Sequence, residues 1–289
     1  MSDTAISSPV LSPILSLGLL QMTSSIDPEE NRAALDAGVR DLAARGAQFV
    51  MTPEMTGLLD GNKERLRSHA TTEDADATVA LARSLASELG LWILLGSQAV
   101  VVDDAPDSLL ANRSFLIGPD GAVRARYDKI HLFDVDLPSG ERYRESNSYR
   151  PGTEAVVAQT PWGKLGLTIC YDVRFAHLFR TLAQAGAKLI AVPAAFTQVT
   201  GEAHWHTLLR ARAIETGCFI AAPAQSGRHK DGRSTFGHSL VIAPWGEVLA
   251  DGGTSPGGVL AQIDLSLVDT ARARIPALQH DRAFELVEV

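Results

Sequence analysis

The sequence predicts an α/β fold with mixed sheets. Apolar runs of strand length alternate with segments of helical periodicity along almost the whole chain, which is typical of strands and helices packed in layers. Three pairs of apolar runs are joined by tight turns, and such hairpins argue against a purely parallel sheet. Composition does not shift between Ile14 and Val268, so we expect one domain over residues 13–289 after a mobile tail at residues 1–12, rich in Ser and Pro.

The first part of the chain carries clear signals for helix ends. Asp27 before Pro28 is the pattern of an N-cap and a first helical residue, and Gly46 ends the same helix. Gly90 ends a second helix in the same way. The other elements expected here are a strand at Ile14–Met22, a strand at Phe49–Thr52, a helix at Thr72–Leu89 and a buried strand at Leu91–Gln98.

Turns that contain Pro and Gly organise the rest. Pro presets its own φ and Gly accepts the left-handed conformation, so each turn between two apolar runs predicts a hairpin. The hairpins join Ser114–Ile117 to Val123–Tyr127, Ala155–Gln159 to Lys164–Ile169, and Ser239–Ala243 to Glu247–Ala250. Between the second and third hairpins we expect a helix at Phe175–Ala185, a strand at Leu189–Pro193, a helix at His204–Thr216 and a strand at Phe219–Ala224.

Composition excludes several classes of protein. With 45% hydrophobic and 21% charged residues in 289, the chain is not disordered as a whole. A formal net charge of −8 argues against a nucleic-acid partner, because binding to phosphates depends on clustered Lys and Arg. No apolar run reaches the ~20 residues that a membrane helix needs, so no membrane partner is expected.

The cysteines and histidines give no sign of a disulfide framework or a metal centre. Cys170 and Cys218 are the only cysteines, which indicates a cytoplasmic setting. Neither a Cys-x-x-Cys nor a His-Glu-x-x-His spacing occurs. His204 and His206 are two residues apart and would point in different directions on a helix, so we expect no metal site.

Three chemically useful side chains follow expected strands. Glu54, Lys129 and Cys170 each come just after an apolar run, and ligands of α/β folds bind where strands end. A thiol with a pKa of ~8.5 is only about 3% ionised at pH 7, so a thiol nucleophile needs a base and a positive field. Glu54 could supply the base and Lys129 could stabilise an oxyanion.

Each of these residues also has an ordinary explanation. A lone Cys at a strand end is usually a small buried hydrophobe, and a Glu or Lys in a loop is usually solvated. Spacing alone does not show whether the three side chains meet.

Three motifs around these residues resemble the Glu, Lys and Cys motifs of the nitrilase superfamily, the carbon–nitrogen hydrolases. The motifs are Thr52–Glu54, Tyr127–Asp134 and Leu167–Phe175, in the family's order and at fitting separations. Further similar stretches are Glu145–Asn147, Pro151–Gly152, Ala203–Trp205 and Leu209–Glu215, so the resemblance extends from about residue 13 to about residue 285.

The resemblance implies a fold and a set of roles. The fold would be a four-layer α-β-β-α sandwich, paired into homodimers or larger assemblies, without metal or organic cofactor. Cys170 would be the nucleophile, Glu54 the general base and Lys129 the oxyanion-stabilising residue. Glu145 matches a second glutamate near the nucleophile, and the backbone N–H of Tyr171 would complete the oxyanion hole.

Further stretches narrow the resemblance to Nit-type amidases. Gly227–Lys230, Ser234–Ser239 and Ala211–Thr216 resemble the branch that cleaves deaminated glutathione to 2-oxoglutarate and cysteinylglycine more than the ω-amidase branch, which acts on 2-oxoglutaramate. Two residues depart from the pattern, Glu202 in place of Pro and His206 in place of Glu. Both flank the segment Phe196–Trp205, which should line the site, so they bear on specificity.

Other residues have both a binding and a structural interpretation. Arg174 and Arg228 could clamp substrate carboxylates through a bidentate fork, or pair with nearby acids. Phe196 and Thr200 follow a strand end and could line the site, although Phe196 suits the core equally well. Structural roles are expected for Arg210, Arg212, Glu215 and Cys218.

These observations together predict a thiol-dependent amidase acting on a small carboxylate-bearing amide. The same residues could hydrate a nitrile or cleave an N-carbamoyl group, and an amine could replace water as acyl acceptor. A catalytically silent scaffold is the non-enzyme alternative. The apolar helix face formed by Leu178, Leu182 and Ala185 is expected to pair copies of the chain.

Overall fold

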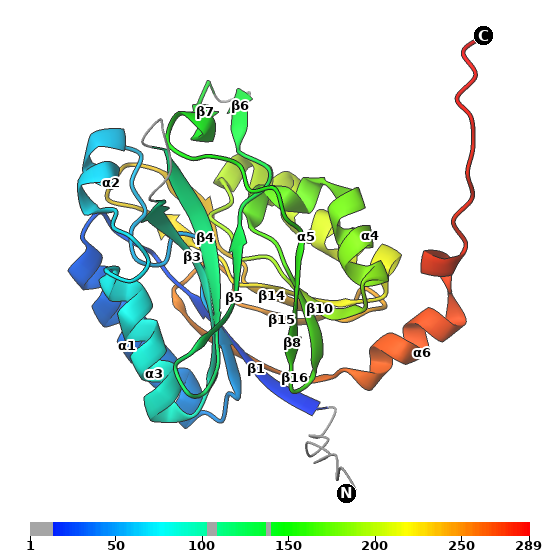
Figure 1. The fold of residues 1–289 in the computed structure, drawn as a ribbon, viewed down its shortest axis with the longest axis horizontal. Coiled ribbons are helices and arrows are strands. Elements are labelled where there is room, and N and C mark those ends of the chain that lie inside the picture. Colours follow the sequence, from blue (N-terminus) through cyan, green and yellow to red (C-terminus); the bar gives the residue numbers. More distant parts are fainter. Residues whose placement is uncertain (1–13, 103–108, 137–139) are drawn as a thin grey trace, which may run out of the picture.

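Two six-stranded β-sheets lie at the centre of the structure, a computed structural model that describes residues 14–102, 109–136 and 140–289 (Figure 1). The tail expected at residues 1–12 lies outside the described residues. The single domain expected over residues 13–289 stays a prediction.

The first sheet is mixed, with three parallel strands at its centre. Its order is β16-β1-β2-β3-β4-β5, in which β1, β2 and β3 are parallel and the remaining neighbours are antiparallel. The strands are β1 (Ile14–Gln21), β2 (Phe49–Met51), β3 (Trp92–Val101), β4 (Leu110–Ile117), β5 (Val123–Asp128) and β16 (Gly257–Asp264).

The second sheet repeats this plan. Its order is β15-β14-β11-β10-β9-β8, with β9, β10 and β11 parallel and the other neighbours antiparallel. The strands are β8 (Val156–Thr160), β9 (Gly163–Leu167), β10 (Ala187–Ala191), β11 (Phe219–Ala222), β14 (Leu240–Ile242) and β15 (Val248–Asp251). Two short hairpins stand apart, namely β6 (Asp134–Asp136) with β7 (Arg142–Arg144) and β12 (Ser226–Arg228) with β13 (Ser234–Phe236).

Helices cover the outer face of each sheet. Helices α1 and α3 pack on the first sheet and α4 and α5 on the second, which gives the four-layer α-β-β-α sandwich (Figure 1). The helices are α1 (Pro28–Ala44), α2 (Lys63–His69), α3 (Ala77–Leu89), α4 (Ala176–Gln184), α5 (Gln198–Thr216) and α6 (Ser266–Arg274). This arrangement confirms the fold class expected from the sequence.

Central strands are apolar on both faces because each is covered on both sides. In β1, Leu17 and Leu19 belong to the cluster that joins the two sheets, while Leu20 packs with Leu35 and Val39 of α1. The period of two therefore divides one strand between two hydrophobic layers.

Local chemistry accounts for most element ends. Asp27 caps α1 by accepting a hydrogen bond from the backbone N–H of Glu29, and Pro28 begins the helix as expected. The first residues of the helix expected at Thr72–Leu89 are not helical, because Asp76 accepts hydrogen bonds from two backbone N–H groups and sets the start at Ala77. Helix α5 begins six residues earlier than the expected His204, at Gln198.

Leu178 and Leu182 of α4 do not form the free apolar surface that was expected to pair copies of the chain, and the pairing itself stays a prediction. Leu178 and Leu182 are only 4% and 1% exposed, because the apolar face of α4 covers the second sheet of its own chain. The apolar face of an amphipathic helix can pack on a sheet of its own chain or on a second copy of the chain. Periodicity in the sequence does not distinguish these two kinds of packing. None of the helices in the described ranges combines the length and apolar character needed to cross a membrane.

Candidate active site

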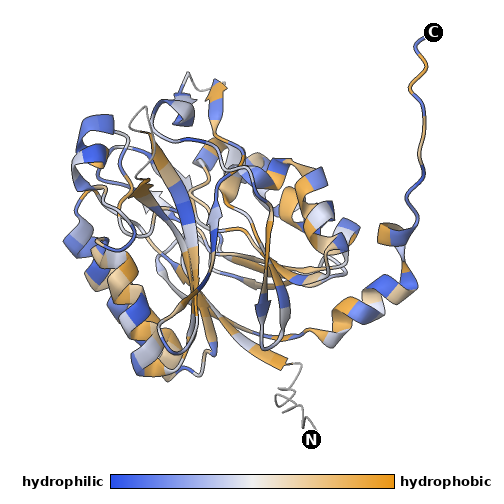
Figure 2. Cartoon of the chain, in the orientation of Figure 1, coloured by the Kyte–Doolittle hydropathy of each residue, from blue (hydrophilic) through white to orange (hydrophobic). Residues whose placement is uncertain are grey.

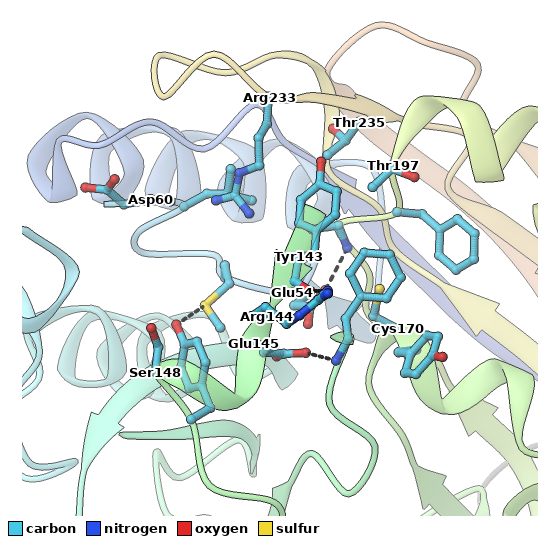
Figure 3. Close-up of a pocket in the computed structure, with 18 of the residues that line it drawn as sticks. Glu54, Asp60, Tyr143, Arg144, Glu145, Ser148, Cys170, Thr197, Arg233 and Thr235 are labelled. Carbon is cyan, nitrogen blue, oxygen red and sulfur yellow. Dashed lines mark hydrogen bonds between the residues drawn. The ribbon is translucent and has the colours of Figure 1, made fainter. Parts of the chain in front are cut away.

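The ends of three strands bring Glu54, Lys129 and Cys170 to one cavity. Glu54 follows β2, Lys129 follows β5 and Cys170 follows β9, and all three line a cavity of about 490 Å³. Glu145, at the start of the 3₁₀ helix η1 (Glu145–Asn147), lines the same cavity. Figure 3 shows Glu54, Glu145 and Cys170 near one another among the lining residues. Folding thus joins residues that are scattered over more than a hundred positions.

Lys129 lies between two carboxylates. Its Nζ donates to Glu54 Oε1 at 2.8 Å and to the two carboxylate oxygens of Glu145 at 3.0 and 2.9 Å. Lys129 is 2% exposed and Glu54 is 5% exposed, so these bonds form out of contact with bulk water. Two carboxylates and one ammonium in a dry site are costly to bury, which points to chemistry rather than to stability.

Further donors fix both carboxylates. The side-chain amide of Asn112 donates to Glu54 at 3.0 Å and to Glu145 at 3.2 Å. The backbone N–H of Ala195 donates to the other oxygen of Glu54 at 2.9 Å, and that of Phe133 donates to Glu145 at 2.6 Å. Sequence reasoning missed Asn112, which is buried in strand β4. The available signal was a polar side chain within a mostly apolar strand, because a buried polar group needs a hydrogen-bond partner.

Cys170 stands on a sharp turn between β9 and the 3₁₀ helix η2 (Cys170–Arg174). Its φ of 47° is rarely adopted by a residue with a side chain, and such strain concentrates at functional sites. The turn is held by the buried carboxylate of Asp172, which accepts from the backbone N–H of Ile169 at 2.8 Å and from the Tyr127 hydroxyl at 2.6 Å. Asp172 therefore fixes the backbone on either side of the thiol.

Electrostatics keep the thiol protonated and the lysine charged. Burial raises the pKa of the Cys170 thiol well above its usual value, and the Glu54 carboxylate raises it further, while Lys129 opposes both. Burial lowers the pKa of Lys129, but the Glu145 and Glu54 carboxylates outweigh burial and hold that pKa well above its usual value. The resting site therefore holds a neutral thiol beside a carboxylate and an ammonium.

The structure brings some of the other expected residues to the cavity. Tyr171, Phe196 and Thr200 line it, and Thr200 shares a hydrogen bond with Thr197 at 2.7 Å. Phe196 also packs against the ring of Trp205. It therefore lines the cavity and belongs to the hydrophobic core at the same time.

Arg174 and Arg228 are not among the described residues that line the cavity. Arg174 instead lies over the rings of Tyr171 and Phe196, and Arg228 is exposed at the end of β12. Their expected contact with substrate is therefore not supported. Glu202 and His206 also lie outside the lining, and Glu202 accepts from Gln198 on the same helix.

Sequence reasoning also missed the basic and aromatic rim. Arg233 reaches into the cavity from the segment before β13, opposite Tyr143 (Figure 3). Its Nε donates to Asp231 at 2.6 Å, which leaves the four N–H groups on the two Nη atoms available for other partners. The remaining charged lining residues are Asp60, Lys63, Glu141, Arg142 and Arg144.

The four-layer sandwich and the buried Cys–Glu–Lys cluster define a thiol hydrolase of carbon–nitrogen bonds. The family described as carbon–nitrogen hydrolase matches residues 16–273, and this chain belongs to that family. The resemblance stated from the motifs is thereby confirmed.

Relatives of known identity agree with this assignment. The deaminated glutathione amidase of Yersinia enterocolitica is 43% identical over 267 residues, which are 92% of each chain. The crystal structure of the NitFhit protein of Caenorhabditis elegans is 38% identical with a TM-score of 0.85, over 94% of this chain and 66% of that one. An amidase from Nesterenkonia sp., solved with acrylamide added to its active-site cysteine, is 26% identical with a TM-score of 0.74, over 91% of this chain and 98% of that one.

Proposed function

We propose that this protein hydrolyses the amide bond of deaminated glutathione through a thioester on Cys170. The observation that carries the proposal is the buried thiol that shares one cavity with Glu54 and the doubly paired Lys129. Relatives that are 43% and 42% identical over at least 90% of this chain are named deaminated glutathione amidase, which supports the substrate.

The acylation step begins with a neutral thiol. Glu54 takes the proton from Cys170 as the sulfur attacks the amide carbon, which becomes tetrahedral. The developing oxyanion accepts hydrogen bonds from Lys129 and from the backbone N–H of Tyr171. Collapse expels the amine, which receives the proton held by Glu54, and leaves the acyl group on sulfur as a thioester.

Water completes the cycle at the same groups. Glu54 removes a proton from the water that attacks the thioester carbon, and the oxyanion again forms beside Lys129. The second tetrahedral intermediate collapses to the carboxylic acid and the Cys170 thiolate, Glu54 returns its proton to the sulfur, and the acid ionises to the carboxylate product on release. Each residue ends in its starting state, so no external acid or base is consumed.

Glu145 acts on the position of Lys129 rather than on the proton transfers. Both of its oxygens accept from the ammonium, and a backbone N–H holds one of them. This keeps the lysine in the cavity when Glu54 changes its protonation state during turnover.

The rim of the cavity suits an acidic substrate. Deaminated glutathione carries a carboxylate at each end, and Arg recognises carboxylates through paired N–H donors. Arg233 carries such donors and belongs to the lining of the cavity. We assign one substrate carboxylate to Arg233.

Replacing Arg233 with Gln should lower kcat/KM for deaminated glutathione by about 10- to 100-fold, because one charge-assisted contact of about 1.5–3 kcal/mol is lost. Steady-state kinetics on deaminated glutathione and on a neutral aliphatic amide measure this, and the neutral amide should lose much less. Arg228→Gln is the matched control, since Arg228 lies on the same hairpin but outside the cavity. Equal losses in the two variants would contradict the assignment.

A substrate panel tests the proposed function. Release of 2-oxoglutarate is followed for deaminated glutathione and 2-oxoglutaramate, and product formation for aliphatic amides, nitriles and N-carbamoyl amino acids. The highest kcat/KM is expected for deaminated glutathione. A preference for 2-oxoglutaramate would instead identify an ω-amidase, and hydroxamate formation with added hydroxylamine would reveal transfer to amines.

We further propose that the chain forms a homodimer or larger homo-oligomer through its C-terminal segment. Residues 280–289 run away from the body of the protein (Figure 1), and hydrophobic positions alternate with hydrophilic ones along this segment (Figure 2). Phe284 and Leu286 are 92% and 83% exposed, which is costly in water. Exposed Trp245, Leu267 and Ile275 provide an apolar surface for the segment of a second copy.

Phe284→Ser combined with Leu286→Ser should therefore weaken the assembly. Light scattering at micromolar concentration should give an assembled wild type and a smaller particle for the double variant. Glu285→Ser is the matched control and should behave as wild type. A wild-type protein that is both monomeric and active under these conditions would refute this assembly.

We also propose a cytoplasmic location. Cys170 and Cys218 are both free and buried, and the proposed chemistry requires a reduced Cys170. Fractionation of cells that produce the protein should find it with cytoplasmic enzymes, and recovery from a membrane or secreted fraction would contradict this.

A further inference from the structure

A cluster of His206, His238 and Asp251 lies outside the catalytic cavity. His206 comes from α5, His238 from the connection between β13 and β14, and Asp251 from the end of β15. One ligand atom of each lies within 4.8 Å of the other two. His206 Nε2 is 3.1 Å from Asp251 Oδ2, and His238 Nδ1 is 2.9 Å from Asp251 Oδ1. The three elements are distant in sequence, and they converge here.

Packing and hydrogen bonds hold each of the three side chains. The His238 ring stacks on Phe236 with centroids 4.4 Å apart, and the His206 ring meets the Phe236 ring edge-on. The backbone N–H of Gly253 donates to Asp251 Oδ1 at 2.8 Å, which fixes the carboxylate. These ligands are therefore oriented before any ion arrives.

The backbone of His238 is also fixed in an unusual conformation. Its φ is 53°, a value that non-glycine residues rarely adopt. The N–H of His238 donates to the carbonyl of Gly253 at 2.6 Å, and its carbonyl accepts from the indole N–H of Trp205 at 2.9 Å. The imidazole is directed at Asp251 by this conformation, as a strained backbone often directs a functional side chain.

We propose that His206, His238 and Asp251 bind one Zn²⁺ ion. Two imidazole nitrogens and one carboxylate oxygen are the donors that zinc accepts, and hard ions such as Mg²⁺ and Ca²⁺ prefer oxygen alone. Atoms bound to one zinc at about 2.0–2.1 Å in a tetrahedron lie about 3.3 Å apart. A single oxygen, Asp251 Oδ2, lies 3.1 Å from His206 Nε2 and 3.1 Å from His238 Nδ1, close to that value.

Binding replaces the hydrogen bonds within the cluster. His206 coordinates through Nε2 and His238 through Nδ1, so each neutral ring carries its proton on the other nitrogen. Asp251 supplies one oxygen, and a water completes the tetrahedron, since the cluster is partly exposed. The ion would fasten α5 to β15 and to the connection that precedes β14.

No metal site was expected from the sequence, because the three proposed ligands are not close to one another along the chain. His204, two residues from His206, points elsewhere and contacts Arg174 at 3.3 Å. His204 is thus a natural control on the same helix.

Zinc binding is measured by titration calorimetry on chelator-treated full-length protein with Cys170→Ala, which removes the catalytic thiol as a competing ligand. The ligand variants are His206→Gln, Asp251→Asn and His238→Asn, the last chosen because Asn tolerates a positive φ. His204→Gln is the matched control.

One Zn²⁺ per chain is expected in the Cys170→Ala protein and with His204→Gln added, and each ligand variant should lose at least tenfold in affinity. No binding, or equal binding with His206→Gln and His238→Asn, would overturn the proposal. Co²⁺ spectra provide a test that needs no ligand variant. With Co²⁺ in place of Zn²⁺, the Cys170→Ala protein should show the ligand-field bands of a tetrahedral Co²⁺ ion. A spectrum of the free hexa-aquo Co²⁺ ion would mean that the site does not bind the metal, and would overturn the proposal.

Discussion

Cys170→Ser is expected to lower turnover by about 10³-fold or more. The nucleophile, its base and the oxyanion-stabilising group act together, so replacing the nucleophile alone removes most of the catalysis that the group provides. An alcohol has a pKa far above that of a thiol, and the Glu54 carboxylate is too weak a base to ionise it. Initial rates with deaminated glutathione measure the effect. The substitution changes one atom in a buried position, so the fold should be retained.

Cys218→Ser is the control for this variant. Cys218 is also buried but does not line the cavity, and its sulfur lies 3.2 Å from the carbonyl of Ala187 and accepts from Arg272. A hydroxyl can make both contacts, so activity should persist. Comparable losses in the two variants would overturn the assignment of the nucleophile.

Glu54→Gln is expected to block acylation itself. The amide keeps the size of the carboxylate but cannot take the proton from Cys170, whose pKa is raised by burial and by Glu54. A lost general base costs about 10²- to 10⁴-fold. Mass spectrometry of the intact variant after brief exposure to substrate should therefore detect no acyl adduct.

Glu145→Gln separates positioning from proton transfer. This variant should still bind substrate and acylate, but turnover should fall by about 10- to 100-fold, the order expected when a reacting group is misplaced by ~1 Å. The reason is that Lys129 loses one of the two carboxylates that hold it. A full acyl adduct on Cys170 in Glu54→Gln, or wild-type turnover in Glu145→Gln, would show that the two roles are assigned wrongly.

Much of the fold could be predicted because local signals agreed with the final packing. The Asp27–Pro28 helix start and the three hairpins are confirmed, since caps and turns depend on residues adjacent in sequence. Strands at the centre of each sheet were recognisable because burial on both faces requires continuous apolar runs. What covers Leu178 and Leu182 of α4 was predicted wrongly, because an apolar stripe does not specify whether its own sheet or a second copy covers it.

The candidate site was only partly predictable. Glu54, Lys129 and Cys170 lie in motifs, so their meeting in one cavity could be expected from resemblance. The roles of Asn112 and Arg233 depend on which strands and hairpins become neighbours, and no local pattern carries that information. The same is true of the cluster around Asp251, whose ligands come together only through the second sheet and α5.

The central claim is that catalysis passes through a thioester on Cys170, and rapid-quench mass spectrometry of the wild-type protein tests it most directly. Samples quenched within the first turnover are digested, and each cysteine peptide is measured. The account predicts a 2-oxoglutaryl adduct on the peptide that contains Cys170, which forms at least as fast as kcat and disappears when substrate is exhausted. Steady turnover with no adduct at any time, or with an adduct on another residue, would contradict it.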